Sequence, residues 1–187
     1  MTPTHPQETI LETYTYNGIA VDLVKWTPTT WCGTIGYALD NCGEPDVDPI
    51  MSGYQSLSFP ENAITRMEDG WDTCISTNYL SPERPNGVMF AFLGDVHEKP
   101  ESVAVQSFPE CQFMRVSFHE DVAAAVGRPS WQGGIPPYEW IGDIIAPHFG
   151  YTYGADDMPI LEYYGNYRLE KGGHEFYYMY VPVKKAD

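Results

Sequence analysis

One acidic residue stands inside a run of apolar and aromatic residues, and its carboxylate is the group in this sequence best placed to do chemistry. The run MPILEYYGNY spans residues 158–167, and Glu162 lies there between Leu161 and Tyr163. A carboxylate buried without partners loses several kcal/mol of hydration. Glu162 therefore either faces water from a half-exposed strand or faces a groove in which another charge compensates it.

Motifs of catalytic and phosphate-binding sites are absent from the sequence. It contains no G-x-S-x-G elbow, no P-loop, no G-x-G-x-x-G and no H-E-x-x-H pattern. His119, Glu120 and Asp121 adjoin one another, but neighbouring positions of a helix or strand point apart and cannot hold one metal ion together. We therefore expect neither a metal site nor a cofactor.

The acidic composition limits the partners that this protein can have. Ten Lys and Arg residues stand against 26 Asp and Glu, a formal charge of -16 that repels DNA and anionic membrane surfaces. The 187 residues fit one domain, 1–187, and contain no apolar run long enough to cross a membrane. With no secretory signal and four widely spaced cysteines, we expect a soluble cytoplasmic protein with reduced thiols.

Alternating apolar and aromatic residues predict β-strands along most of the chain. Residues 10–26 hold two such runs around Asn17-Gly18, a dipeptide that suits a tight hairpin because both central residues adopt positive φ. Residues 102–118 have the same form, with a break at Pro109-Glu110. The sequence therefore predicts two copies of one hairpin.

A second pair of matching segments lies farther along each half of the chain. Residues 74–94 and 160–183 each read as a strand, a polar turn rich in Pro or Gly, and a second strand. Tyr79 ends the first strand of the earlier segment as Tyr164 ends that of the later one, and Thr77 then matches Glu162.

Apolar residues at helical spacing predict one helix in each half, over residues 46–57 and 136–150, with a kink at Pro147. The half-repeats then span about 10–95 and 100–185. An antiparallel sheet with a helix on one face leaves its other face free. The predicted fold is therefore α+β, a tandem repeat about a pseudo-twofold axis with antiparallel sheets around a central groove.

The order of these segments, the strand ILEYY and the terminal EFYYMYVPVKK resemble the GyrI-like small-molecule-binding domain, the effector-binding domain of AraC-type and MerR-type multidrug regulators. The resemblance covers residues 10–185. It implies two strand-helix-strand-strand modules with a ligand groove along the pseudo-twofold axis. In several regulators of this kind the groove has aromatic walls and a buried glutamate and takes up lipophilic cations. No helix-turn-helix segment is recognisable, so we expect the stand-alone form.

The resemblance also implies which residues face the ligand. Glu162 lies about twenty residues before the Tyr-x-Pro motif, where the family's ligand-facing glutamate falls. Strand alternation places Met179, Val181 and Val183 beneath the helix and leaves an aromatic set for the groove, Phe176, Tyr178 and Tyr180. Half-buried tyrosines with hydrated hydroxyls fit the same pattern equally. The predicted ligand-binding set is Glu162, Tyr164, Tyr178, Tyr180, Phe176, Trp140, Tyr79, Trp71 and Glu175, the last as the alternative carboxylate.

The function expected from these residues is the binding of lipophilic, cationic aromatic compounds in an acidic aromatic groove. A first alternative is a hydrolase, similar to GyrI-like enzymes that open electrophilic cyclopropane rings of toxic natural products, with Glu162 as the candidate catalytic residue. A second alternative is an acidic protein-interaction module, similar to the family's gyrase inhibitors. A heme carrier of related fold has no histidine marked as a ligand.

Overall fold

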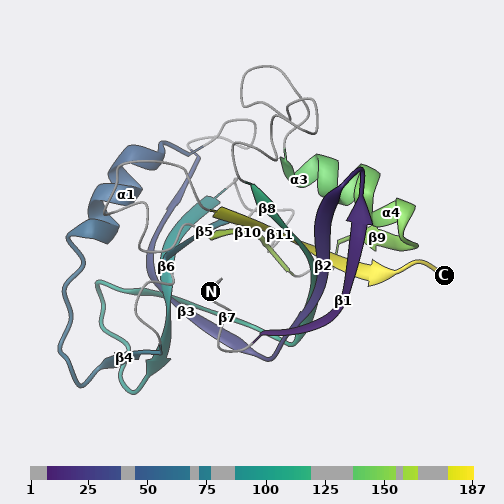
Figure 1. Ribbon diagram of the computed structural model, residues 1–187. Helices are drawn as coiled ribbons and strands as arrows, with labels where there is room; N and C mark the ends of the chain where they lie inside the picture. Colours follow the sequence, from purple (N-terminus) through teal and green to yellow (C-terminus); the bar gives the residue numbers. More distant parts are fainter. Residues whose placement is uncertain are drawn as a thin grey trace.

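The computed structural model describes residues 8–38, 45–67, 72–76, 87–118, 137–154, 158–163 and 177–187. Within these ranges the chain is α+β, as predicted, with antiparallel strands and few helices (Figure 1). The strands are β1 (Glu8–Tyr16), β2 (Ile19–Trp26), β3 (Thr29–Tyr37), β4 (Ile64–Arg66), β5 (Asp72–Ser76), β6 (Gly87–Val96), β7 (Ala104–Phe108), β8 (Cys111–Phe118), β9 (Tyr151–Tyr153), β10 (Ile160–Tyr163) and β11 (Tyr177–Lys185).

The two predicted helices are present. Helix α1 (Val47–Gln55) begins after Asp46, whose side chain accepts a hydrogen bond from the backbone N–H of Asp48. The second helical segment runs without a break through α3 (Pro137–Glu139), η1 (Trp140–Ile145) and α4 (Ala146–His148). Pro147 has no N–H to donate, and the N–H of Ala146 bonds the carbonyl of Ile141 five residues back. A π-helical turn therefore precedes Pro147, and the kink at this residue stays a prediction.

One continuous antiparallel sheet holds both halves of the chain, in the order β1-β2-β8-β11-β10-β5-β6-β3-β7, with β4 on β6 and β9 on β11. The segments from β3 to β6 and from β8 to β11 repeat the same sequence of elements, a strand, a helix, a short strand and two longer strands. They also repeat the same pairings, and β5 pairs with β10 where the two segments meet. The halves thus share one sheet rather than facing each other as two separate sheets.

The prediction of a hairpin over residues 102–118 is wrong. Strand β7 pairs with β3, and β8 pairs with β2 and β11, so the break at Pro109-Glu110 does not reverse the chain. In the real hairpin between β1 and β2, Asn17 and Gly18 have φ of 49° and 83°, as a tight reversal requires. The counterpart of β7–β8 is β2–β3, which is interrupted at Thr27-Pro28.

Strands β2–β3 and β7–β8 form one long, bent, two-stranded ribbon. The β2–β8 ladder ends at the pair Trp26 and Cys111, and the β3–β7 ladder begins at Thr29 and Phe108. Because β3 and β8 are also the outer strands of the two repeats, the ribbon brings the ends of the sheet together, and the strands curve around a common interior (Figure 1).

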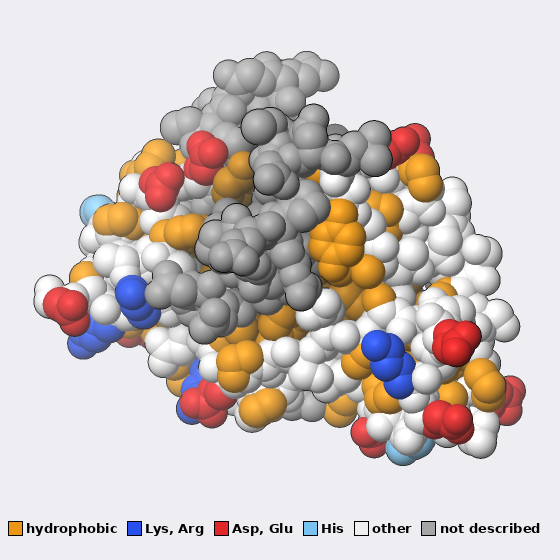
Figure 2. Space-filling model, turned by 180° about the vertical axis from the view of Figure 1, so that it is seen from behind, with side chains coloured by type: hydrophobic (Ala, Val, Ile, Leu, Met, Phe, Trp, Pro, Cys, Tyr) orange, Lys and Arg blue, Asp and Glu red, His pale blue; other side chains and the backbone are white. Residues whose placement is uncertain are grey.

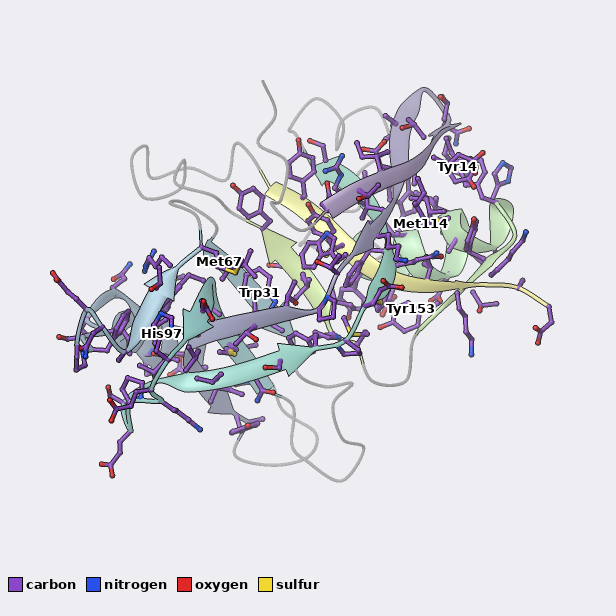
Figure 3. The ribbon with its side chains drawn as sticks, turned by 90° about the horizontal axis from the view of Figure 1, so that it is seen from below. Tyr14, Trp31, Met67, His97, Met114 and Tyr153 are labelled. Carbon is purple, nitrogen blue, oxygen red and sulfur yellow. The ribbon has the colours of Figure 1, made fainter. Side chains whose placement is uncertain are left out.

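The curved sheet separates the core into a helix-side face and an inner face. On the helix-side face, the second helical segment packs in the half that contains β8 and β11, while Tyr54 and Leu57, within and just after α1, pack on a smaller cluster around Phe92. Figure 3 shows Met114 and Tyr153 on the side of the second helical segment and Trp31 on β3 nearer the middle. The inner face is lined by Val24, Trp26, Trp31, Ile75, Met89, Ala91, Leu93, Phe108, Cys111, Phe113, Met158, Leu161, Tyr163 and Tyr180.

Candidate functional site

Glu162 lies on β10, one of the two strands that join the halves. Its β-ladder partners are Cys74 on β5 and Met179 on β11. The residue is half-buried, whereas Leu161 and Tyr163 on either side are only 1% and 6% exposed. A carboxylate thus stands at the junction of the two repeats, partly withdrawn from water.

The register of β10 and β11 determines which face Glu162 occupies. Directly opposed residues of an antiparallel pair project to the same side of the sheet, so Glu162 shares a face with Met179. Met179 belongs to the helix-side core together with Ile160 and Trp140. Glu162 and Trp140, two of the predicted ligand-binding residues, therefore lie on the helix-side face.

Tyr178 and Tyr180 lie on the other face. Tyr180 is fully buried in the inner core, and Tyr178 packs against that core and stacks on Tyr163, with ring centroids 6.2 Å apart. The prediction that Met179, Val181 and Val183 pack beneath the helix is confirmed. The sequence predicts that Glu162, Tyr178 and Tyr180 line one groove. This prediction is wrong, because the sheet separates Tyr178 and Tyr180 from Glu162.

Several predicted residues lie outside the described part of the chain. The structure therefore gives no placement for Tyr79, Tyr164, Trp71, Phe176 and Glu175. Thr77 is also outside it, and the ladders relate Glu162 to a different residue. Ile64 is the first residue of β4, which pairs with β6, and Tyr151 is the first residue of β9, which pairs with β11. When β6 and β11 are aligned on the residues paired with Ile64 and Tyr151, the residue paired with Cys74 matches the residue paired with Glu162. Cys74 is therefore the counterpart of Glu162.

The inner face holds a charged cluster that sequence reasoning missed. Arg115 on β8 has a side chain only 6% exposed, and its Nη1 donates to the Glu8 carboxylate on β1. Its Nη2 donates to Oδ2 of Asp22 on β2 at 2.5 Å. Trp26 Nε1 donates to the second oxygen of Glu8 at 2.9 Å, and the guanidinium lies 4.9 Å from the ring centroid of Tyr178.

The cluster carries one positive and two negative charges. Burial lowers the pKa of Arg115, but the charge of Glu8 and the hydrogen bond to Asp22 raise it by more, so its guanidinium stays charged. Burial, followed by the charge of Glu8, raises the pKa of Tyr180 well above its usual value, and its hydroxyl stays protonated. A sign of this cluster was present in the sequence, since Arg115 interrupts the alternating run CQFMRVSF as Glu162 interrupts its own strand.

Other chemistry is sparse among the described residues. No group of three or more His, Cys, Asp or Glu side chains there is arranged to hold a metal ion. Within the same ranges, no helix has the length and apolar character needed to span a membrane. On the face shown in Figure 2, acidic side chains lie mainly near the edges of the view, several of them close together at the lower right beside a basic side chain.

We expect the thiols of Cys32 and Cys111 to be inert in the folded protein. Burial raises the pKa of Cys32 to about 11 and that of Cys111 to about 12, so almost no thiolate is present at pH 8. Alkylation by iodoacetamide, followed by peptide mass mapping, should be about 100-fold or more slower at both positions than in urea. Equal rates in the two conditions would show that these strands open freely.

Comparisons with known proteins identify the fold. No protein-family model matches the sequence, and a search of curated proteins finds no match. The crystal structure of the EcmrR C-terminal domain is 14% identical, with a TM-score of 0.54 over 89% of this chain and 98% of that domain. A putative bacterial transcription regulation protein from Staphylococcus aureus MU50 is 15% identical, with a TM-score of 0.50 over 89% of this chain and 99% of that chain.

A chain of the cryo-EM structure of the EcmrR–DNA complex matches with a TM-score of 0.51 and 14% identity over 89% of this chain. The present chain spans only 57% of that protein. At such low identity the likeness concerns the fold alone, and the conclusion is that this chain has the fold of the EcmrR C-terminal domain.

Proposed function

We propose that this protein binds lipophilic aromatic cations on the helix-side face, at the junction of β5 and β10, with Glu162 as the counter-charge. The observation that carries the proposal is the placement of Glu162, a half-buried carboxylate between buried residues on the strand that joins the two repeats. As part of the same proposal, we infer that this chain is a GyrI-like domain. The fold shared with the EcmrR C-terminal domain and the segments ILEYY and EFYYMYVPVKK support this assignment.

The energies involved are sufficient for micromolar binding. A cation about 4 Å from a carboxylate gains roughly 4 kcal/mol at an effective dielectric constant near 20, before desolvation is subtracted. One aromatic contact adds about 0.5 to 2 kcal/mol. A micromolar dissociation constant corresponds to about 8 kcal/mol, and burial of apolar ligand surface at about 25 cal/mol per Å² supplies the remainder.

The inner face is the poorer candidate for a cation. Its two carboxylates, Glu8 and Asp22, already bind the guanidinium of Arg115, which also lies over the ring of Tyr178. A ligand cation there would have to displace an arginine that the chain itself supplies at high effective concentration.

Glu162→Gln is expected to weaken the binding of tetraphenylphosphonium by about 10- to 100-fold, or roughly 1.4 to 2.7 kcal/mol. The amide keeps the shape of the side chain and removes its charge. The measurement is a calorimetric titration, supported by quenching of tryptophan fluorescence, because Trp140 lies on the same face as Glu162.

Two controls separate local from general electrostatics. Glu139→Gln removes an exposed carboxylate from the second helical segment and should change the affinity by less than about 2-fold. Triphenylphosphine oxide, a neutral aromatic compound, should bind equally well to the unmodified protein and to the Glu162→Gln variant. If the cation binds both proteins with equal affinity, Glu162 is not the counter-charge and the proposal fails.

A further inference from the structure

We infer that Arg115 is the centre of a second binding site, on the inner face, for the carboxylate group of a small aromatic acid, and that the chain keeps this site filled with its own Glu8. The site lies on the opposite face from Glu162 and does not rest on the proposed cation binding. It takes a ligand of the opposite charge.

The contacts of Glu8 are those of a bound carboxylate. Its side chain is only 1% exposed although it belongs to an otherwise largely exposed strand, and one of its oxygens accepts a hydrogen bond from Arg115. The other oxygen accepts from the indole N–H of Trp26 at 2.9 Å. A guanidinium and an indole N–H, both buried and both directed at one carboxylate, are a recognition site for that chemical group.

Glu8 leaves part of this site unused. Among the described residues, Nε of Arg115 and the hydroxyl of Tyr180 are buried and neither makes a hydrogen bond of normal geometry, although the hydroxyl lies close enough to Glu8 and Arg115 for both to affect its pKa. Buried polar groups are rarely left unpaired, because each costs free energy that a partner would recover. A carboxylate free of the main chain can shift toward these groups, whereas Glu8 is fixed by its strand.

Aromatic rings around Arg115 favour a ligand with an aromatic body. Tyr178 is partly exposed, and its ring lies beneath the guanidinium. The rings of Trp26 and Tyr180 contact each other, with centroids 4.8 Å apart and planes inclined at 56°. A ring attached to the entering carboxylate would occupy the space that the start of β1 vacates. Benzoate is the simplest compound with both groups.

Strand β1 is built so that Glu8 can leave. Among the described residues it is the outermost strand at one end of the sheet and pairs with β2 alone, and its register shifts between Ile10 and Glu12. Residues 9–13 are all exposed. An edge strand with so few buried contacts opens locally at a lower free energy than the sheet as a whole, so Glu8 acts as a tethered ligand that a stronger free ligand can replace.

Glu8→Ala tests the inference in the full-length chain. The variant should melt at a lower temperature than the unmodified protein, and sodium benzoate should raise its melting temperature by about 3 °C or more in a saturable way. Sodium chloride at equal ionic strength should not. Because Glu8 no longer competes, benzoate should bind the variant at least about 10-fold more tightly than the unmodified protein.

Glu12→Ala is the matched control. It removes an exposed carboxylate from the same strand, where Glu12 accepts a hydrogen bond from Tyr14, and should gain no response to benzoate. Adding Arg115→Met to Glu8→Ala should abolish the response. A Glu8→Ala protein that benzoate stabilises no more than chloride does, or a response of the same size in Glu12→Ala, overturns the inference.

If Glu8→Ala does not fold, the unmodified protein provides the decisive measurement. Benzoate that displaces Glu8 must release the start of β1, so hydrogen exchange of the amides of residues 9–13 should accelerate by about 5-fold or more at saturation. The amides of β6 serve as the internal reference. Exchange rates in β1 that do not change as benzoate is added would show that Glu8 is a permanent part of the scaffold.

Discussion

Replacing Arg115 by methionine should destabilise the protein by about 3 to 5 kcal/mol, because it leaves the carboxylates of Glu8 and Asp22 without the cation that compensates them. Methionine retains much of the arginine's apolar stem, so the loss reports mainly on charge. The midpoint and slope of urea unfolding measure it.

Two further variants show whether the loss arises from the carboxylates. Combining Arg115→Met with Glu8→Gln and Asp22→Asn removes all three charges and should recover most of the lost free energy, since buried ion clusters are often no more stable than uncharged packing. Arg66→Met removes an arginine that is exposed and lies over the ring of Phe92, and should cost less than about 1 kcal/mol. Equal losses for Arg115→Met and Arg66→Met would contradict the buried cluster.

Gly33→Ala is expected to cost about 3 kcal/mol or more, which corresponds to a fall of roughly 6 to 12 °C in melting temperature for a chain of this size. Gly33 lies on β3, and a Cβ atom there would stand 1.9 Å from the carbonyl oxygen of Phe90 and 2.7 Å from the Cα of Ala91. Both obstacles are main-chain atoms of β6, so the ladder between the two strands must open to admit the methyl group.

Gly53→Ala is the matched substitution on α1. The nearest atom to its added Cβ is Cγ2 of Thr34 at 3.1 Å, a side-chain atom that can move. Replacing glycine within a helix also contributes about 1 kcal/mol of stabilisation. The melting temperature should therefore change by only a few degrees, and a fall as large as that of Gly33→Ala would show that the close approach of β3 and β6 is not the cause.

The sequence predicted those parts of the fold that local patterns determine. Asn17-Gly18 indicated the β1–β2 hairpin, and apolar spacing indicated both helices. Alternation along β11 identified Met179, Val181 and Val183 as the residues beneath the helix. Each of these signals acts within a few residues of the chain.

The remainder depends on pairings between distant residues, which a single sequence does not display. Alternation divides a strand into two sets of side chains, but the register with the next strand decides which sets share a face. The pairing of Glu162 with Met179 therefore separated this glutamate from Tyr178 and Tyr180. In the same way, the pairs of Arg115 with Glu8 and Asp22 connect β8 with a hairpin whose paired residues lie 107 and 93 positions earlier in the sequence.

The bent ribbon of β2–β3 and β7–β8 has a consequence for synthesis. When the first half of the chain leaves the ribosome, β2 and β3 have been made. Their partners along one edge, β8 for β2 and β7 for β3, are synthesised only after residue 103. The first repeat therefore keeps an unpaired edge along β3 until β7 is made, and β2 keeps one until β8, the first strand of the second repeat, follows. Such long-range pairing makes folding slow.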